Sequence, residues 1–118
     1  MLEEPLQAIP ETVEGVRLVM LVDKDGMLVC RAGSSETDAE VVAVSYTDLA
    51  RQIGRVHAEA ELDPPSEMVV AGHQGAVLFQ HVTEEYGLIA QLEPEATLGR
   101  VRYEMRKAAA KLRPELED

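Results

Sequence analysis

The sequence holds few side chains suited to acid–base, nucleophilic or metal chemistry. The three histidines, His57, His73 and His81, fall in a predicted helix, a turn and a strand, and none has a second ligand at metal spacing, such as i+4 on a helix. Cys30 lies in an apolar segment, where a thiol is usually packed and inert. No Ser, His and carboxylate group together in a way that suggests a triad. We therefore expect no catalytic residue, no bound metal and no enzyme activity.

Two loop motifs resemble ligand sites but lack required residues. Asp23-Lys24-Asp25-Gly26 begins like a calcium loop, yet Ser34 stands where that loop needs a bidentate Glu. Gly72-His73-Gln74-Gly75 is too short and too poor in glycine for a phosphate loop. Both segments are predicted to be turns, and no cofactor is expected.

Composition excludes several classes of partner for this chain of 118 residues. Eleven Lys and Arg stand against 22 Asp and Glu, a net charge of −11, which argues against nucleic acid. A single cysteine excludes an internal disulfide, and no apolar run is long enough to span a bilayer. The start, Met1-Leu-Glu-Glu-Pro5, lacks the basic region of a secretory signal. We expect one cytoplasmic domain over residues 1–118, with its core at about 6–112.

A β-hairpin is predicted near the beginning of the chain. The apolar runs Val16–Asp23 and Met27–Ala32 flank an Asp-Gly turn signal. The first run is almost continuously apolar rather than alternating, which is typical of a strand covered on both faces. The pattern therefore predicts helices on both sides of the sheet.

Three helices are predicted from the spacing of apolar residues. The first is expected to kink or end near Ile9, because Pro10 lacks an amide hydrogen. The longest covers about residues 38–60, capped by Asp38 or by Ser35 earlier. The last begins after Thr97 and ends at Pro114.

The longest predicted helix carries two neighbouring rows of side chains. The row interpreted as core-facing holds Val42, Tyr46, Leu49, Ile53, Val56 and Ala60. The second row, about 100° further round, holds Ala43, Thr47, Ala50, Gly54 and His57. Small side chains permit close approach of another backbone, such as the same helix of a second subunit. The alternative, that Ala and Gly merely lie near solvent, stays open.

Three more strands are predicted after Pro64-Pro65, at residues 66–72, 76–82 and 86–92, with connections of hairpin length. The order is α-β-β-α-β-β-β-α, an α+β fold of three layers with helices on both faces of a five-stranded antiparallel sheet. If the hairpin and the meander join through strands one and five, the strand order is 2-1-5-4-3. The third strand then lies at an edge.

That edge strand predicts self-association. Its residues Met68, Val69, Val70, Ala71 and Gly72 include neither Lys nor Pro to protect the edge. We expect two copies to pair antiparallel through it into a homodimer with one ten-stranded sheet. In this hypothesis the small row of the long helix, with Ala43, Ala50 and Gly54, packs on its twin.

The last predicted helix concentrates positive charge. It holds six of the eleven basic residues: Arg100, Arg102, Arg106, Lys107, Lys111 and Arg113. A solvated face, with cations near the negative end of the helix dipole, explains most of this. A docking patch for an acidic partner is the alternative.

Several motifs give the chain a resemblance to the Roadblock/dynein light chain family, from about Leu6 to Leu112. They are the segments Val13–Val16, Leu18–Val29, Tyr86–Ala90 and Thr97–Ala108. The resemblance implies the profilin-like Roadblock fold and a homodimer. It specifies fold more closely than function.

The resemblance further implies a non-enzymatic platform that engages small Ras-like GTPases. Bacterial members similar to MglB are partners and activators of MglA-type GTPases in cell polarity and motility, and there the GTPase supplies the nucleotide site. Two contacts with a GTPase are possible, the paired long helices or the flank of the sheet. We expect the exposed side of the long helix, around Thr47, Arg51 and Arg55, to be the docking surface. The alternative is a small-ligand sensory or binding module, because an α+β sheet with helical covers can enclose a pocket.

Overall fold

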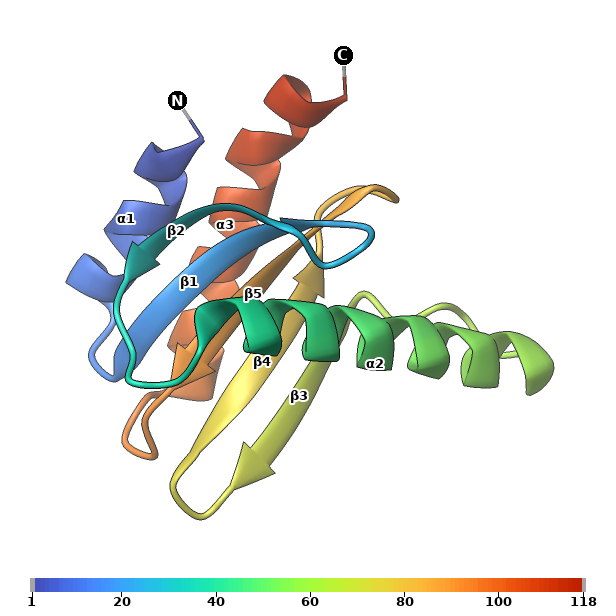
Figure 1. Cartoon of the computed structure of the whole chain (residues 1–118), viewed down its shortest axis with the longest axis horizontal. Coiled ribbons are helices and arrows are strands. Elements are labelled where there is room, and N and C mark those ends of the chain that lie inside the picture. Colours follow the sequence, from blue (N-terminus) through green and yellow to red (C-terminus); the bar gives the residue numbers. More distant parts are fainter. Residues whose placement is uncertain (1, 118) are drawn as a thin grey trace.

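A five-stranded antiparallel sheet lies between two helical layers in the computed structural model, which describes residues 2–117 (Figure 1). The strand order is β2-β1-β5-β4-β3, and every neighbouring pair is antiparallel. The elements are α1 (Glu3–Thr12), β1 (Val16–Asp23), β2 (Leu28–Gly33), α2 (Ala39–Glu59), β3 (Glu67–Gly72), β4 (Gly75–His81), β5 (Tyr86–Leu92) and α3 (Leu98–Leu116). The predicted fold class and strand order are confirmed.

The first hairpin forms where the sequence predicts it. Asp23 Oδ1 accepts hydrogen bonds from the amides of Asp25 at 2.9 Å and Met27 at 3.0 Å. That carboxylate therefore stabilises the turn. Strand β1 pairs with β2 on one side and β5 on the other, and Leu18–Val22 is fully buried.

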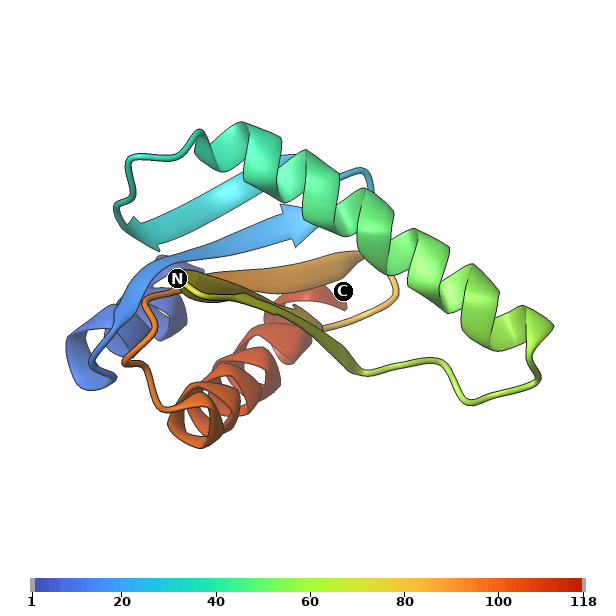
Figure 2. The same ribbon diagram turned by 90° about the horizontal axis from the view of Figure 1, so that it is seen from below.

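Two separate clusters of buried residues lie on the two faces of the sheet. Helices α1 and α3 cover one face, and α2 alone covers the other (Figure 2). On the first face Leu6 and Ile9 of α1 pack with Met105 and Leu112 of α3. The second cluster is smaller and includes Phe79. None of the helices within residues 2–117 is both long and apolar enough to cross a bilayer.

Two predicted helix ends are wrong, since Pro10 lies inside α1 and Pro114 inside α3. Each proline removes one donor close to a helix end, and the next turn is retained. The Val13 amide donates to the Ile9 carbonyl at 2.9 Å, and the Glu117 amide to the Arg113 carbonyl at 3.1 Å. Packing of the residues around each proline on the first cluster outweighs a single missing hydrogen bond.

Candidate interaction surfaces

Helix α2 is held against the sheet by its small residues. Asp38 caps the helix, because its Oδ1 accepts from the amides of Glu40 at 3.0 Å and Val41 at 3.3 Å. The β1–β2 turn approaches so closely that a Cβ added at Gly26 would lie 2.8 Å from Val44 Cα. Little space is left for large side chains between helix and sheet. The buried residues of α2 are accordingly Ala39, Ala43, Thr47 and Ala50.

The sequence-based assignment of the second row of α2 is therefore wrong, whereas the core-facing assignment of the first row holds for Val42 and Tyr46, which are partly buried against the second cluster. Ala43 and Ala50, expected to meet a second subunit, are 0% and 6% exposed because they face the chain's own sheet. Thr47, expected to contact a GTPase, is also only 6% exposed. Toward the C-terminal end of the helix the large row is open to solvent, and Val56 is 57% exposed. A Cβ at Gly54 would meet nothing within 4 Å, so that position is open.

The flank of α2 that carries the large row runs beside edge strand β3. Tyr46 of α2 lines the same groove as Val70 and Val77. The C-terminal half of α2 extends past β3, away from the body of the molecule (Figures 1 and 2). Together these residues form a surface that we call the apolar edge, comprising Tyr46, Ile53 and Val56 of α2 and Met68–Gly72 of β3.

The apolar edge has unused backbone groups as well as exposed side chains. Strand β3 pairs with β4 on one side, and no described strand pairs with its other side. The last four residues of β3 are exposed, and Val69 and Val70 are 36% and 41% exposed. A free strand edge beside apolar side chains is a template for pairing with another chain.

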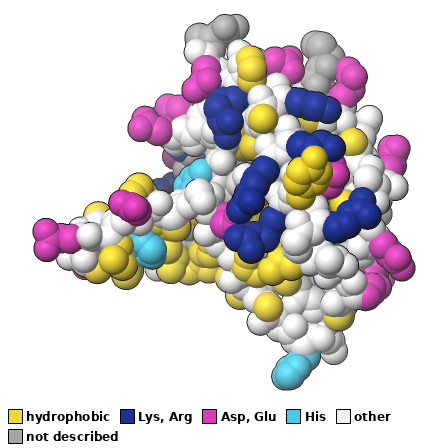
Figure 3. All heavy atoms as spheres, turned by 180° about the vertical axis from the view of Figure 1, so that it is seen from behind, with side chains coloured by type: hydrophobic (Ala, Val, Ile, Leu, Met, Phe, Trp, Pro, Cys, Tyr) yellow, Lys and Arg dark blue, Asp and Glu magenta, His cyan; other side chains and the backbone are white. Residues whose placement is uncertain are grey.

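The outer face of α3 carries most of the basic side chains (Figure 3). Arg102 and Arg106 share one carboxylate, that of Glu67 on β3, with an Arg106 Nη2 to Glu67 Oε1 distance of 3.0 Å. Lys107 lies 3.4 Å from the Glu104 carboxylate and 5.2 Å from the centre of the Tyr103 ring. Because two guanidinium groups share one anion, this face keeps a surplus of positive charge.

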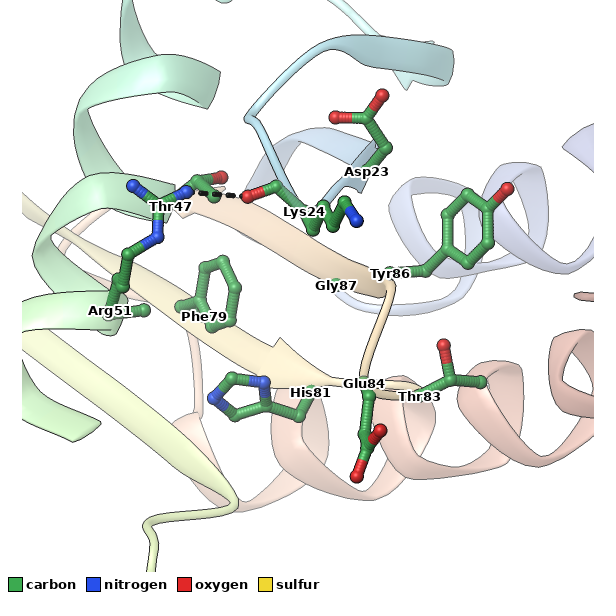
Figure 4. A pocket seen from close by; sticks show the side chains of 11 residues that line it. Asp23, Lys24, Thr47, Arg51, Phe79, His81, Thr83, Glu84, Tyr86 and Gly87 are labelled. Carbon is green, nitrogen blue, oxygen red and sulfur yellow. Dashed lines mark hydrogen bonds between the residues drawn. The ribbon is translucent and has the colours of Figure 1, made fainter. Parts of the chain in front are cut away.

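A cavity of about 160 Å³ lies between α2 and the turns that join β1 to β2 and β4 to β5 (Figure 4). Gly87 and Phe79 line it, and Gly87 lets the Phe79 ring lie directly on the backbone of β5: a Cβ there would be 2.6 Å from ring Cζ. Thr47 also lines the cavity, and its buried Oγ1 has no hydrogen-bond partner. A polar atom entering the cavity would satisfy this hydroxyl.

The rim of the cavity adds two hydrogen-bonding groups. Arg51 is fixed there, because one guanidinium nitrogen donates to the Lys24 carbonyl at 2.7 Å (Figure 4). The other nitrogen donates to Asp48 at 3.4 Å. The His81 ring packs edge-on against Phe79 with 5.1 Å between centroids, and this loss of water lowers the pKa of His81. Burial therefore favours the neutral form of this imidazole.

Sequence analysis missed the role of Phe79 and treated His81 as an ordinary histidine. Their i, i+2 spacing on one strand was the available signal, because it directs both side chains to the same face of the sheet. Nothing in the sequence placed them beside Thr47 and Arg51, which lie on a helix about thirty residues earlier. Arg55 follows Arg51 by one turn and is exposed.

The remaining candidates for chemistry lie apart from one another. Cys30 is buried, and burial, with a smaller contribution from the Glu3 carboxylate, raises the pKa of its thiol. His57 Nδ1 lies 2.8 Å from the Asp63 carbonyl, and His73 is in the exposed β3–β4 turn. Within residues 2–117, no group of three His, Cys, Asp or Glu side chains could hold a metal ion.

Comparison with known proteins agrees with this description. Residues 6–92 match the family model described as Roadblock/LC7 domain. A Methanocaldococcus jannaschii protein, MJ1340, described as uncharacterized, is 26% identical over 85% of this chain and 87% of its own length. The structure of Myxococcus xanthus MglB superposes with a TM-score of 0.90 at 20% identity, covering 98% of this chain and 94% of MglB. MglC from the same organism gives a TM-score of 0.68 at 26% identity, covering 98% of this chain and 100% of MglC.

Proposed function

The chain belongs to the Roadblock/LC7 domain family, as its motifs indicated, and we propose that it is a non-enzymatic homodimeric adaptor for a small Ras-like GTPase of the MglA type. In this proposal the adaptor modulates GTP hydrolysis by its partner, in cell polarity or motility. The structural likeness to MglB and MglC supports a regulatory adaptor role. The observation that carries the proposal is the apolar edge, a surface that a second protein chain completes.

The proposed dimer joins two apolar edges. The free side of β3 pairs antiparallel with its twin, so that Met68, Val69, Val70, Ala71 and Gly72 lie at the centre of a ten-stranded sheet. The large row of α2, which includes the exposed Val56, packs against the same row of the partner helix. Gly54 lies in the part of α2 that is open in the single chain, and it stays in the proposed interface.

A lysine at the apolar edge tests the dimer. Val70 on β3 is 41% exposed and Val29 on β2, the opposite edge strand, is 43% exposed, so Val70→Lys and Val29→Lys are a matched pair. Gel filtration with light scattering at micromolar concentration should show dimers for the parent chain and V29K, and monomers for V70K, because two buried lysines would face each other across the twofold. A parent chain that is monomeric under these conditions contradicts the proposal.

The proposed docking site for the GTPase is the flank of α2 opposite the apolar edge. Arg51 is fixed over the cavity there and Arg55 is exposed one turn later. Both remain accessible in the proposed dimer, whereas Thr47 contributes only to the lining of the cavity.

Mixing experiments with the small GTPase encoded nearest to this chain's gene test the docking site. Co-elution and an altered rate of phosphate release are expected, and R51E/R55E should weaken binding about tenfold through charge reversal, with R100E on α3 as control. If several such GTPases fail to bind in both GDP and GTP-analogue states, while the dimer is intact, the adaptor proposal fails.

The cavity supports a second candidate, a small-ligand sensory or binding module. Its buried, unpartnered Thr47 Oγ1 could orient one polar ligand atom, and the Phe79 ring supplies an apolar wall. The midpoint temperature of thermal unfolding should then rise when a metabolite pool contains the ligand. T47V, which replaces the hydroxyl by a methyl group, should abolish that rise. If no pool changes the midpoint temperature, the result favours the adaptor function without a ligand.

A further inference from the structure

The charge of the chain is divided sharply between α3 and everything else. Helix α3 carries six basic and two acidic residues, whereas the rest of the chain carries five basic and twenty acidic residues. The space-filling view from behind shows Lys and Arg side chains gathered over this helix, with acidic side chains around the margin (Figure 3). A strongly acidic protein therefore presents one cationic face.

The cations of α3 form two rows along the helix. At about 100° per residue, Arg102, Arg106 and Arg113 fall on one side of its outer face. The contacts agree, because the two guanidiniums near the start reach Glu67 of β3 and Arg113 Nε donates to the Val82 carbonyl after β4 at 2.8 Å.

The second row lies on the side of α3 that faces α1. It consists of Arg100, Lys107 and Lys111, and Arg100 Nη2 lies 3.4 Å from the carbonyl of Thr12 at the end of α1. Lys111 lines a shallow surface depression together with Glu115 of α3 and the α1 residues Glu4, Pro5 and Ala8. All three cations of this row are exposed.

Between the two rows runs an uncharged lane centred on Tyr103. The lane also includes Gly99, Ala110 and Pro114, and all four residues are exposed. Tyr103 is the largest of them and is 62% exposed, with the Lys107 ammonium 5.2 Å from its ring centre. Exposed Tyr and Arg together are typical of residues that dominate binding energy at protein interfaces.

We propose that this outer face of α3 docks an acidic amphipathic helix of a partner protein. An apolar stripe on that helix contacts Tyr103 and the small residues of the lane, while its flanking carboxylates pair with the two cationic rows. From Arg100 to Lys111 the surface is about 16 Å long, which matches about three turns of a helix. The surface lies on the opposite side of the sheet from α2, so it is free in the proposed dimer and does not depend on the GTPase.

The balance of charge favours a short acidic segment over an extended polyanion. A membrane surface or a nucleic acid is larger than this patch, and it would also face the acidic remainder of the chain, whose repulsion opposes binding. A single helix of about three turns covers only the cationic face. Such a helix is therefore attracted by the cations of α3 and is not repelled by the acidic remainder of the chain.

The probe for this proposal is a fluorescent synthetic helix of about five turns, with Leu along one stripe and Glu on both flanks. Its counterpart has Gln in place of every Glu. Fluorescence anisotropy with the full chain should show binding of the Glu helix at least tenfold tighter than the Gln helix, and the difference should shrink between about 0.05 M and about 0.5 M NaCl as screening increases.

Variants of exposed residues locate the binding face. K107E/K111E reverses two cations of one row and should weaken binding of the Glu helix about tenfold, and Tyr103→Ser should weaken it severalfold. The control is R31E, which reverses the charge of an exposed residue on β2. Its neighbours Cys30 and Ala32 belong to the first cluster, so Arg31 points to the face of the sheet away from α3. Circular dichroism checks that each variant is folded.

Three outcomes overturn the proposal. The first is equal binding of the Glu and Gln helices, or no binding of the Glu helix below about 0.5 mM. The second is equal loss of binding with R31E and with K107E/K111E. The third is stronger binding to vesicles of mixed phosphatidylcholine and phosphatidylserine, or to a DNA duplex, than to the Glu helix, since either result makes an extended polyanion the occupant.

Discussion

Helices α3 and α2 cover the two faces of one sheet, but the side chains that they bury against it differ in size. Helix α3 buries large apolar residues on its inner side, with Val101, Met105 and Leu112 each 0% exposed, and it turns its cations and Tyr103 to solvent. Helix α2 buries Ala43 and other small residues instead, and it leaves large residues such as Val56 exposed. Each helix is amphipathic, but only α3 has its apolar side fully matched within the chain.

This difference assigns stability and binding to different faces. Burial of large side chains is the main source of folding free energy, so the α1/α3 side supplies most of it. On α2, Val42 and Tyr46 pack against the second cluster, whereas Val56 is exposed and contributes little to the folding of a single chain. In the two proposals above, the exposed apolar residues of α2 serve association and the cations of α3 serve selective electrostatic contact.

The sharpest test of this comparison truncates one large side chain on each helix. Leu112→Ala should lower the free energy of unfolding by about 3 kcal/mol, because it leaves a cavity in the first cluster. Val56→Ala should change it by less than about 0.5 kcal/mol when measured in the V70K background, where the proposed dimer is absent. Urea denaturation followed by circular dichroism measures both.

The same two variants in the otherwise unaltered chain test the other half of the comparison. There V56A should also weaken self-association, so its midpoint should lie further below that of the parent chain than in the monomeric background, and should depend less strongly on protein concentration. Equal losses for L112A and V56A in the monomeric background would mean that α2 packs as completely as α3.

The sequence was sufficient to predict what depends on local pattern. The Asp-Gly turn and the continuous apolar run of β1 predicted a hairpin covered on both faces. The order 2-1-5-4-3 was predicted on the condition that the hairpin and the meander join through strands one and five. The three helices were predicted as well. Each inference needed only the period of the apolar residues and one turn signal.

The choice between the two rows of α2 could not be made from the sequence. Periodicity gives the angle between Val42 and Ala43 but not the distance of the helix from the sheet. That distance is set by the close approach of Gly26 to Val44 and by the space that Phe79 occupies, both of which are contacts between distant segments. The cavity beside Thr47 was missed for the same reason.

A substitution on the sheet tests how tightly the α2 side is packed. Gly87→Ala should lower the free energy of unfolding by about 2 kcal/mol, because the new Cβ would meet the Phe79 ring at 2.6 Å and force it toward α2. Gly99→Ala on α3 is the matched control. A Cβ there meets nothing within 4 Å, and alanine favours the helix, so this variant should be neutral or slightly more stable.

If G87A is as stable as the parent chain, the Phe79 ring has room to move and the α2 side is loosely packed. The two faces of the sheet would then differ in packing density as well as in the size of the side chains that they bury. Urea midpoints for G87A and G99A, measured together, separate these cases.

The smallest expected effect is a pH dependence confined to the α2 side. The pKa of His81 is lowered in the folded chain by loss of water beside Phe79, whereas in the unfolded chain it is near the ordinary value of about 6.5. The unfolded chain therefore binds a proton first as the pH falls. His81 makes no contribution at pH well above 6.5, and below that value it progressively lowers the free energy of unfolding until the folded-state pKa is passed.

His81→Gln should remove this contribution, so the variant should gain stability relative to the parent chain as the pH falls from about 8 to about 5. His73→Gln, in the exposed β3–β4 turn, is the control. Protonation of His81 would place a charge in the wall of the cavity. Any ligand that excludes water from the cavity should therefore strengthen the pH dependence of stability. If the free energies of unfolding of H81Q and the parent chain change in parallel with pH, water reaches the His81 ring freely. The α2 side would then be open at the cavity as well as along the flank of the helix.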